Sequence, residues 1–184
     1  IGMNTAVAGV ASLFAAPFAT PLAARFGVAQ TLLAAILLGA FSFLGFYFFD
    51  GFLAWALLRT TLHFALTILF ILSEFWITTS CPPNKRGLML GIYATVLSLG
   101  FAVGPWIFSV LGSHGPTPFI AGFIIILCAI LPVLMALKQS PHIADEEHKS
   151  FVPFLFAVPT ATAAVLVFGA VETGGFALLP IYGT

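Results

Sequence analysis

The chain has 184 residues, of which 61% are hydrophobic and 7% are charged, and its formal net charge at pH 7 is zero. Its mean hydropathy is +1.15. Soluble domains are roughly 45 to 50% apolar and about 25% charged, so this composition excludes a soluble globular fold. The neutral balance and the lack of a basic run give no reason to expect a nucleic-acid partner. Two cysteines are too few for a disulfide framework.

Long apolar runs fill almost the whole chain. The hydrocarbon core of a bilayer is about 30 Å thick, so a helix needs about 20 apolar residues to cross it. Six runs are long enough: residues 3–24, 28–49, 52–79, 88–112, 117–137 and 151–171. Only helices and closed barrels satisfy their backbone inside lipid, and these runs lack the alternating pattern of barrel strands. The sequence therefore predicts an all-α polytopic membrane protein with six transmembrane helices and the lipid bilayer as its principal partner.

Positive charges lie in alternate gaps between the predicted helices. The first, third and fifth gaps hold five of the six Lys and Arg residues: Arg25, Lys85, Arg86, Lys138 and Lys149. The second and fourth gaps hold none. Because short loops rich in Lys and Arg stay in the cytoplasm, we expect the odd-numbered gaps to be cytoplasmic. The protein is thus predicted to be a multi-pass protein of the cell (inner or plasma) membrane.

The gaps are short, so consecutive helices must pack as antiparallel neighbours. The longest gap, residues 138–150, is the most polar segment and is predicted to be a cytoplasmic linker between two membrane subdomains. Residues 1–137 would then hold five helices of the first subdomain, and residues 151–184 the first helix of the second. Because the chain begins at Ile1 without a basic leader and stops shortly after its last apolar run, we expect it to be a fragment of a longer protein.

The third predicted helix, residues 52–79, contains three ionisable side chains, Arg59, His63 and Glu74. A charge at the centre of a bilayer costs about 2.5–3.5 kcal/mol even on the lenient insertion scale, so these residues need compensation. At about 100° per residue, His63, Thr67 and Glu74 lie about 40°, 80° and 60° around the helix from Arg59. The four residues form one polar stripe, which we expect to face the bundle interior or a watery cavity.

The stripe offers candidates for function. Arg59 is the candidate for binding a solute or a coupling ion, and the alternative is a structural arginine satisfied by carbonyls of another helix. His63 either shares that role or makes a structural hydrogen bond. Glu74 lies about 22 Å along the axis from Arg59, too far for an ion pair, and is the candidate for a gate or a loop anchor.

A further acid, Glu172, ends the last apolar run and precedes a Thr-Gly-Gly sequence. A second buried acid would suit proton coupling, whereas a position at the outer interface would leave it in water. The linker residues from His142 to His148 include histidines and acids, but no metal-binding motif accompanies them, so we expect neither a metal site nor a cofactor.

The fourth predicted helix contains Gly100 and Gly104 in a Gly-x-x-x-Gly pair, followed by Pro105. Such a pair permits close helix contact, and the proline permits a kink. Helix packing is the simplest interpretation of this pattern.

Several motifs together resemble the Major Facilitator Superfamily. The sequence PLAARFG at 21–27 is similar to the family's Gly-x-Leu-Ala-Asp-Arg-x-Gly-Arg loop, with Arg25 and Gly27 at matching positions. Arg59 matches the arginine that the family carries in its fourth helix. PPNKRG at 82–87, which includes Arg86, is similar to the turn between the fourth and fifth helices. The Gly100 to Pro105 segment looks like a fifth-helix motif of exporters.

The resemblance covers essentially the whole chain and places it at about the second to seventh of twelve helices. Segments 73–76, 90–93 and 172–182 look most like the YcaD-type branch of the family. The resemblance implies secondary active transport of a small solute, proton coupling, and alternating access between two six-helix halves. The exporter-like motif favours efflux over import.

Two other classes of function stay open on the sequence. An intramembrane enzyme would need a nucleophile and base or a metal set at one depth, and His63 is the one histidine within a predicted span. A channel or an assembly subunit would be compatible with the glycine-rich helix faces. No nucleotide-binding Gly-x-x-x-x-Gly-Lys-Ser/Thr loop is present to power transport by ATP. The order of the motifs favours a transporter that is not an enzyme.

Overall fold

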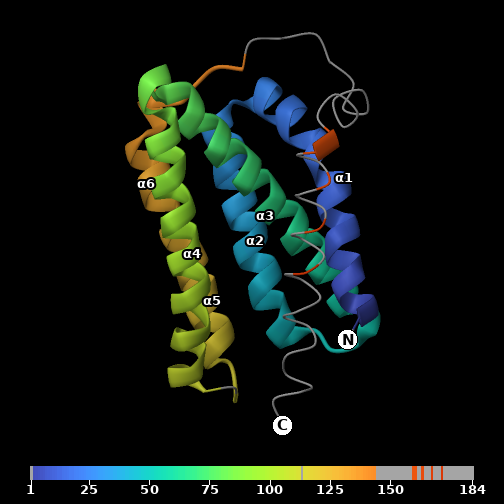
Figure 1. The fold of residues 1–184 in the computed structure, drawn as a ribbon. Helices are drawn as coiled ribbons and strands as arrows, with labels where there is room; N and C mark the ends of the chain where they lie inside the picture. The colour runs from blue at the N-terminus through green and yellow to red at the C-terminus, as the bar shows by residue number, and fades with distance from the viewer. Residues whose placement is uncertain are drawn as a thin grey trace. The chain divides into compact units, whose positions relative to one another are not determined.

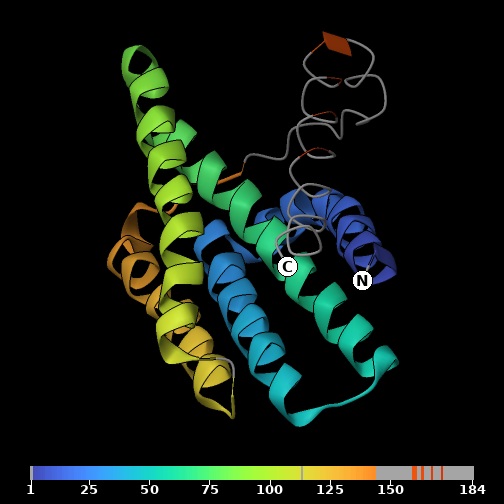
Figure 2. The ribbon, with the colours of Figure 1, turned by 60° about the horizontal axis from the view of Figure 1, so that its bottom comes forward.

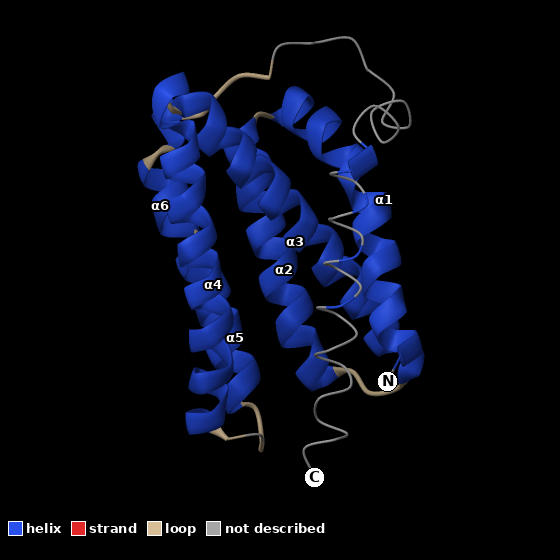
Figure 3. Cartoon of the chain, in the orientation of Figure 1, coloured by secondary structure: helices blue, strands red, loops and turns tan. Residues whose placement is uncertain are grey.

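The computed structural model describes residues 2–112 and 114–143, together with residues 159, 160, 163, 167 and 171. Two compact units divide the chain, one covering Val7–Ala144 and the other combining Ile1–Ala6 with Asp145–Thr184. The description that follows concerns the first unit. Within the described residues all regular secondary structure is helical, as Figure 3 shows, which confirms the predicted all-α fold.

The first five helices alternate in direction along the chain, and the sixth continues in the direction of the fifth (Figure 1). Their bounds are Gly2–Phe26 (α1), Val28–Phe48 (α2), Phe52–Ser80 (α3), Arg86–Leu111 (α4), Thr117–Cys128 (α5) and Ile130–Met135 (α6), with 3₁₀ turns at Pro83–Lys85 (η1) and Leu137–Gln139 (η2). The up-and-down order brings the α1–α2 turn, the α3–α4 connection and the end of α6 to one end of the unit. Arg25, Lys85, Arg86 and Lys138 therefore share that end.

Four described stretches are long and apolar enough to cross a membrane: Val28–Phe48, Phe52–Ser80, Pro83–Leu111 and Thr117–Met135. They agree with the second to fifth predicted spans within a few residues. The first predicted span is found as the helix α1. The sixth, 151–171, lies outside the described residues apart from five positions, which are helical.

The fifth span is interrupted where the sequence predicts one continuous helix. Pro132 lacks a backbone N–H and therefore cannot bond the carbonyl of Cys128, four residues earlier. The backbone tightens there, and the N–H of Ala129 donates to the carbonyl of Ile126 at 3.1 Å. The result is two consecutive helices, α5 and α6, in place of one.

Helix α2 lies at the centre of the unit. Figures 1 and 2 both show it between α3 on one side and α5 on the other. Ten of its residues are buried, among them Ala35, Gly39 and Ala40. Small residues let helix backbones approach closely inside lipid, where no hydrophobic effect drives helices together.

Helix α1 contributes a row of alanines to the same core. Ala11, Ala15, Ala19 and Ala23 recur every four residues and are all buried. A spacing of four keeps side chains on one helix face, so this face is flat and small. Ala19 and Ala23 pack with residues of α2 and α3 in one cluster: Val28, Leu32, Ala35, Ile68 and Leu72.

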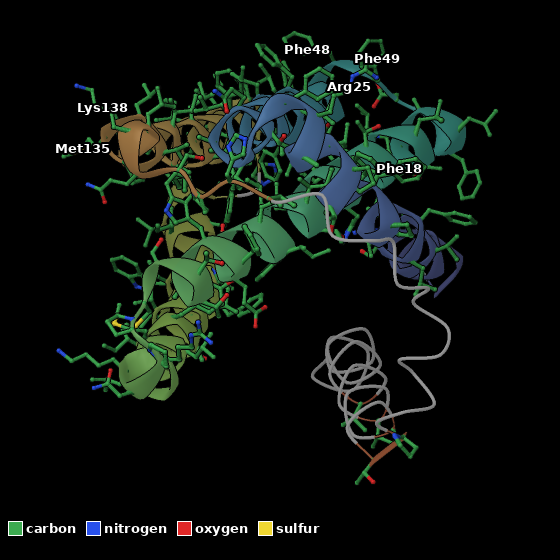
Figure 4. The ribbon with its side chains drawn as sticks, turned by 90° about the horizontal axis from the view of Figure 1, so that it is seen from above. Phe18, Arg25, Phe48, Phe49, Met135 and Lys138 are labelled. Carbon is green, nitrogen blue, oxygen red and sulfur yellow. The ribbon has the colours of Figure 1, made fainter. Side chains whose placement is uncertain are left out.

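The outer surface of the unit is apolar. Exposed aromatic and aliphatic side chains occur on every helix of the unit, and Met135, for example, is 86% exposed. Figure 4 labels six exposed side chains: Phe18, Arg25, Phe48, Phe49, Met135 and Lys138. A soluble protein rarely exposes apolar surface on this scale, whereas a lipid-facing surface requires it.

One glycine allows α2 and α5 to pack together. A Cβ atom at Gly122 of α5 would collide with the ring of Phe43 on α2. That ring cannot move freely, because its centroid lies 6.3 to 6.5 Å from the rings of Phe46, Phe108 and Phe119. The aromatic cluster joins α2, α4 and α5.

We predict that Gly122→Ala lowers the stability of the protein by about 1–3 kcal/mol, because overpacking forces the Phe43 ring out of its position. Thermal unfolding of the purified protein in detergent measures the effect. Gly91→Ala on α4 is the matched control, since a Cβ there meets no heavy atom within 4 Å among the described residues. Equal melting temperatures for the two variants would contradict this account of the contact.

Candidate functional site

The polar stripe predicted from the sequence lies on one unbroken helix, α3. Arg59, His63 and Thr67 are half-buried, and Glu74 is exposed. The hydroxyl of Thr67 donates to the carbonyl of His63 at 2.8 Å, which satisfies it within its own helix. Thr67 therefore needs no partner from another helix.

The stripe faces away from the packed core of the unit. The buried residues of α3 are Ala65, Ile68 and Leu72. At about 100° per residue they lie about 240°, 180° and 220° around the helix from Arg59. The centre of this buried face and the centre of the polar stripe are therefore about 170° apart, so among the described residues the packed core lies on the apolar side of α3 and the half-buried stripe lies on the opposite side.

Arg59 and His63 lie one helical turn apart, and the guanidinium charge acts electrostatically on the imidazole. Within residues 2–112 and 114–143 no carboxylate forms an ion pair with Arg59. The described acids are Asp50, in the α2–α3 turn, and Glu74. The arrangement leaves a guanidinium and an imidazole, both half-buried, on one face of α3, where together they could bind an anionic or polar group.

Glu74 has a neighbour that the sequence analysis did not single out. Its carboxylate interacts electrostatically with Tyr93 on α4. Glu74 lies six residues before the end of α3 and Tyr93 seven residues after the start of α4, so both lie about 9–10 Å from the same end. That matching depth across the α3–α4 connection is the sequence signal that could have identified Tyr93.

The loop candidates lie at the end that carries the positive charges. Arg25 is exposed, and its guanidinium lies 5.3 Å from the centre of the Phe26 ring. Gly27 has φ of 90°, a backbone conformation that favours glycine, and it forms the turn into α2. Arg86 is the exposed first residue of α4.

The Gly100, Gly104 and Pro105 motif lies on α4, whose described residues are not buried. A Cβ atom at either glycine meets no heavy atom within 4 Å among the described residues. The helix continues through Pro105 to Leu111. The close helix contact expected from this pattern stays a prediction.

The remaining candidates fall mostly beyond the described residues. Glu172 lies outside them, as does the linker cluster from Asp145 to His148. The part of the chain that the structure describes contains no group of three or more metal-ligating side chains. Cys81 and Cys128, which both lie in that part, are free thiols.

A cavity of about 360 Å³ lies between α1, α2 and α3 near the end that carries Arg25. Its lining is almost entirely apolar: Leu22, Phe26, Gln30, Thr31, Ala34, Ala35, Leu38, Phe64 and Ile68. Phe64 and Ile68 lie about 140° and 180° around α3 from Arg59. The cavity lining on α3 therefore lies on a different side of the helix from Arg59.

These features define a polytopic helical membrane protein with a polar face on one of its helices. The family model of the Major Facilitator Superfamily matches residues 1–184. The chain belongs to the Major Facilitator Superfamily.

One curated relative is the "Uncharacterized MFS-type transporter YfkF" of Bacillus subtilis (strain 168), which is 26% identical over 149 residues. The match covers 81% of this chain and 38% of the relative, so the chain spans well under half of that protein's length. No solved structure matches the chain.

We predict that His63→Cys reacts with a water-soluble thiol reagent in the intact membrane-embedded protein, whereas Ala65→Cys does not. The first position is on the polar stripe, and the second is fully buried on the opposite face. Both variants are made after Cys81 and Cys128 are replaced by alanine, and labelling is measured by mass spectrometry. Protection of both cysteines, or reaction of Ala65→Cys alone, would rule out a watery face at the stripe.

Proposed function

We propose that the intact protein is a secondary active transporter that moves a small polar or anionic solute across the cell membrane and couples this movement to protons. Membership of the Major Facilitator Superfamily supports a transporter. The observation that carries the more specific proposal is the position of Arg59 and His63, which lie on the face of α3 opposite its packed core. An ionisable residue within a membrane span is a candidate functional group by default.

In this proposal Arg59 binds the anionic or polar group of the solute, and His63 contributes a second contact one turn away. An arginine offers five donors in a planar fork, which suits a carboxylate or phosphate better than a lysine would. Glu74, Glu172 or both would carry the coupled proton. Glu74 would also act as a gate near the helix end, where its carboxylate influences Tyr93 of α4 electrostatically.

Transport would take place between two halves of the protein, with the described helices forming most of one half. The open polar face of α3 would then line the path between the halves, and rocking of one half against the other would alternate its access. The segment 138–150 would connect the two halves. Assignment to the YcaD-type branch stays a prediction, and efflux is the direction favoured by the Gly100 to Pro105 pattern.

The central test is Arg59→Ala in the full-length protein. We expect solute-driven proton flux to fall at least about tenfold, because a charge-assisted hydrogen bond contributes about 1.5–3 kcal/mol. Proteoliposomes loaded with a pH-sensitive dye are challenged with a panel of small carboxylate and phosphate solutes.

The matched control is Thr61→Ala, two residues along α3 and about 200° around the helix from Arg59. Its hydroxyl donates to the carbonyl of Leu57 at 2.8 Å, so its hydrogen bond lies within α3. This variant should retain wild-type flux. Normal flux in Arg59→Ala would remove the guanidinium from the mechanism.

We also propose that the end carrying Arg25, Lys85, Arg86 and Lys138 is cytoplasmic, since positive loops are retained on that side. In intact cells, a membrane-impermeant maleimide should label Asp50→Cys but label Lys85→Cys only after the membrane is permeabilised. Both variants lack Cys81 and Cys128. The reverse labelling pattern would invert the topology.

A further inference from the structure

The first turn of α2 is held by a residue that lies far away in the sequence, beyond the end of α6. The hydroxyl oxygen of Ser140 accepts a hydrogen bond from the backbone N–H of Ala29 at 3.2 Å, across 111 residues of sequence. Ala29 is the second residue of α2, and both Val28 and Ala29 have 0% exposed surface. Backbone donors in the first turn of a helix have no partner within the helix.

No side chain at the start of α2 accepts a hydrogen bond from these backbone N–H groups. The residue at the N-cap position is Gly27, which has no side chain, and α2 has no side-chain cap of its own. Serine is among the best acceptors for a helix N-terminus. Ser140 thus takes the role of an N-cap residue, although it belongs to the segment that leaves α6.

A second contact fastens the same segment. Ile143, three residues after Ser140, packs against the core cluster formed by α1, α2 and α3. Between them, Pro141 restricts the backbone and has no N–H to satisfy. The compact unit that contains the helices also continues to Ala144, beyond the end of η2.

We propose that residues 138–143 form a strap that belongs to the helical unit, and that Ser140 is a positioning residue for the α1–α2 turn. The turn carries Arg25 and Gly27, two of the family-matching residues. Residues 138–143 of the linker predicted at 138–150 would then belong to the helical unit. This inference does not depend on transport or on proton coupling.

The strap gives the connection a specific mechanical effect. A pull on an unfastened linker would act on the end of α6 alone. The strap is fixed at two points, because the Ser140 hydroxyl accepts a hydrogen bond from Ala29 of α2 and Ile143 packs on the core. A force on the strap would therefore act on the start of α2 and on the turn before it. The strap therefore couples the connection to the loop that carries Arg25.

The test uses the full-length protein in lipid nanodiscs and compares Ser140→Ala with Ser140→Thr. Hydrogen exchange of the backbone amides in residues 27–31 should become about tenfold faster in Ser140→Ala, because the buried N–H of Ala29 loses its acceptor. Ser140→Thr keeps a hydroxyl and should exchange at the wild-type rate.

The matched control is Ser98→Ala on α4. Its hydroxyl donates to the carbonyl of Ala94 at 2.9 Å, within its own helix, so its loss should leave exchange at residues 27–31 unchanged. Unchanged exchange in Ser140→Ala would overturn the proposal, and so would equal acceleration in Ser140→Thr.

A second measurement leaves Ser140 intact and so does not depend on whether its variants fold. Spin labels are attached at Gln30→Cys and His142→Cys, two exposed positions, in a protein without Cys81 and Cys128. A docked strap predicts a single narrow distribution of distances between the labels. A broad distribution would show that residues 138–143 are not fixed to α2 and would overturn the proposal.

Discussion

Inside a bilayer the chain must satisfy every backbone polar group from within, because the hydrocarbon offers no water. This requirement accounts for the helices and for the behaviour of their polar side chains. The hydroxyls of Thr31, Ser42 and Thr67 each donate to a carbonyl four residues earlier, at 2.7–2.8 Å. Each of these hydroxyls has its hydrogen-bond partner within its own helix and needs none from a neighbouring helix. Among the described residues, no side-chain hydrogen bond within α3 is found for Arg59, His63 or Glu74, and that difference separates these candidates from the structural polar residues.

The same requirement shapes the packing. Since lipid tails are as apolar as leucine, helices associate through close fit rather than through exclusion of water. The alanine row of α1 and the small buried residues of α2 provide that fit, and Gly122 admits the ring of Phe43. Helix α3 divides into a buried apolar face and an opposite polar face, on which Arg59, His63 and Thr67 are half-buried. A packed scaffold on one side of α3 can therefore hold Arg59 in a fixed position on the other.

The periodic and compositional features of the fold could be predicted from the sequence. Apolar runs gave the spans within a few residues, and angular spacing placed Arg59, His63 and Glu74 on one stripe. The break between α5 and α6 was missed, although Pro132 provides a local reason for it. The bond between Ser140 and Ala29 has no such signal, because it joins residues that only the packing of α6 beside α2 brings together. The interaction of Tyr93 with Glu74 could have been predicted in part, because the two residues lie at similar distances from the connected ends of α3 and α4.

The central claim is that the polar face of α3 is turned toward an aqueous path and away from lipid. The most direct test is a cryo-electron microscopy structure of the full-length protein in a lipid nanodisc. The account predicts that the guanidinium of Arg59 lies in a hydrated cavity between two helical halves, with Ala65, Ile68 and Leu72 packed on the opposite side of the helix. A guanidinium directed into the acyl chains, or enclosed by a single half without access to water, would contradict it.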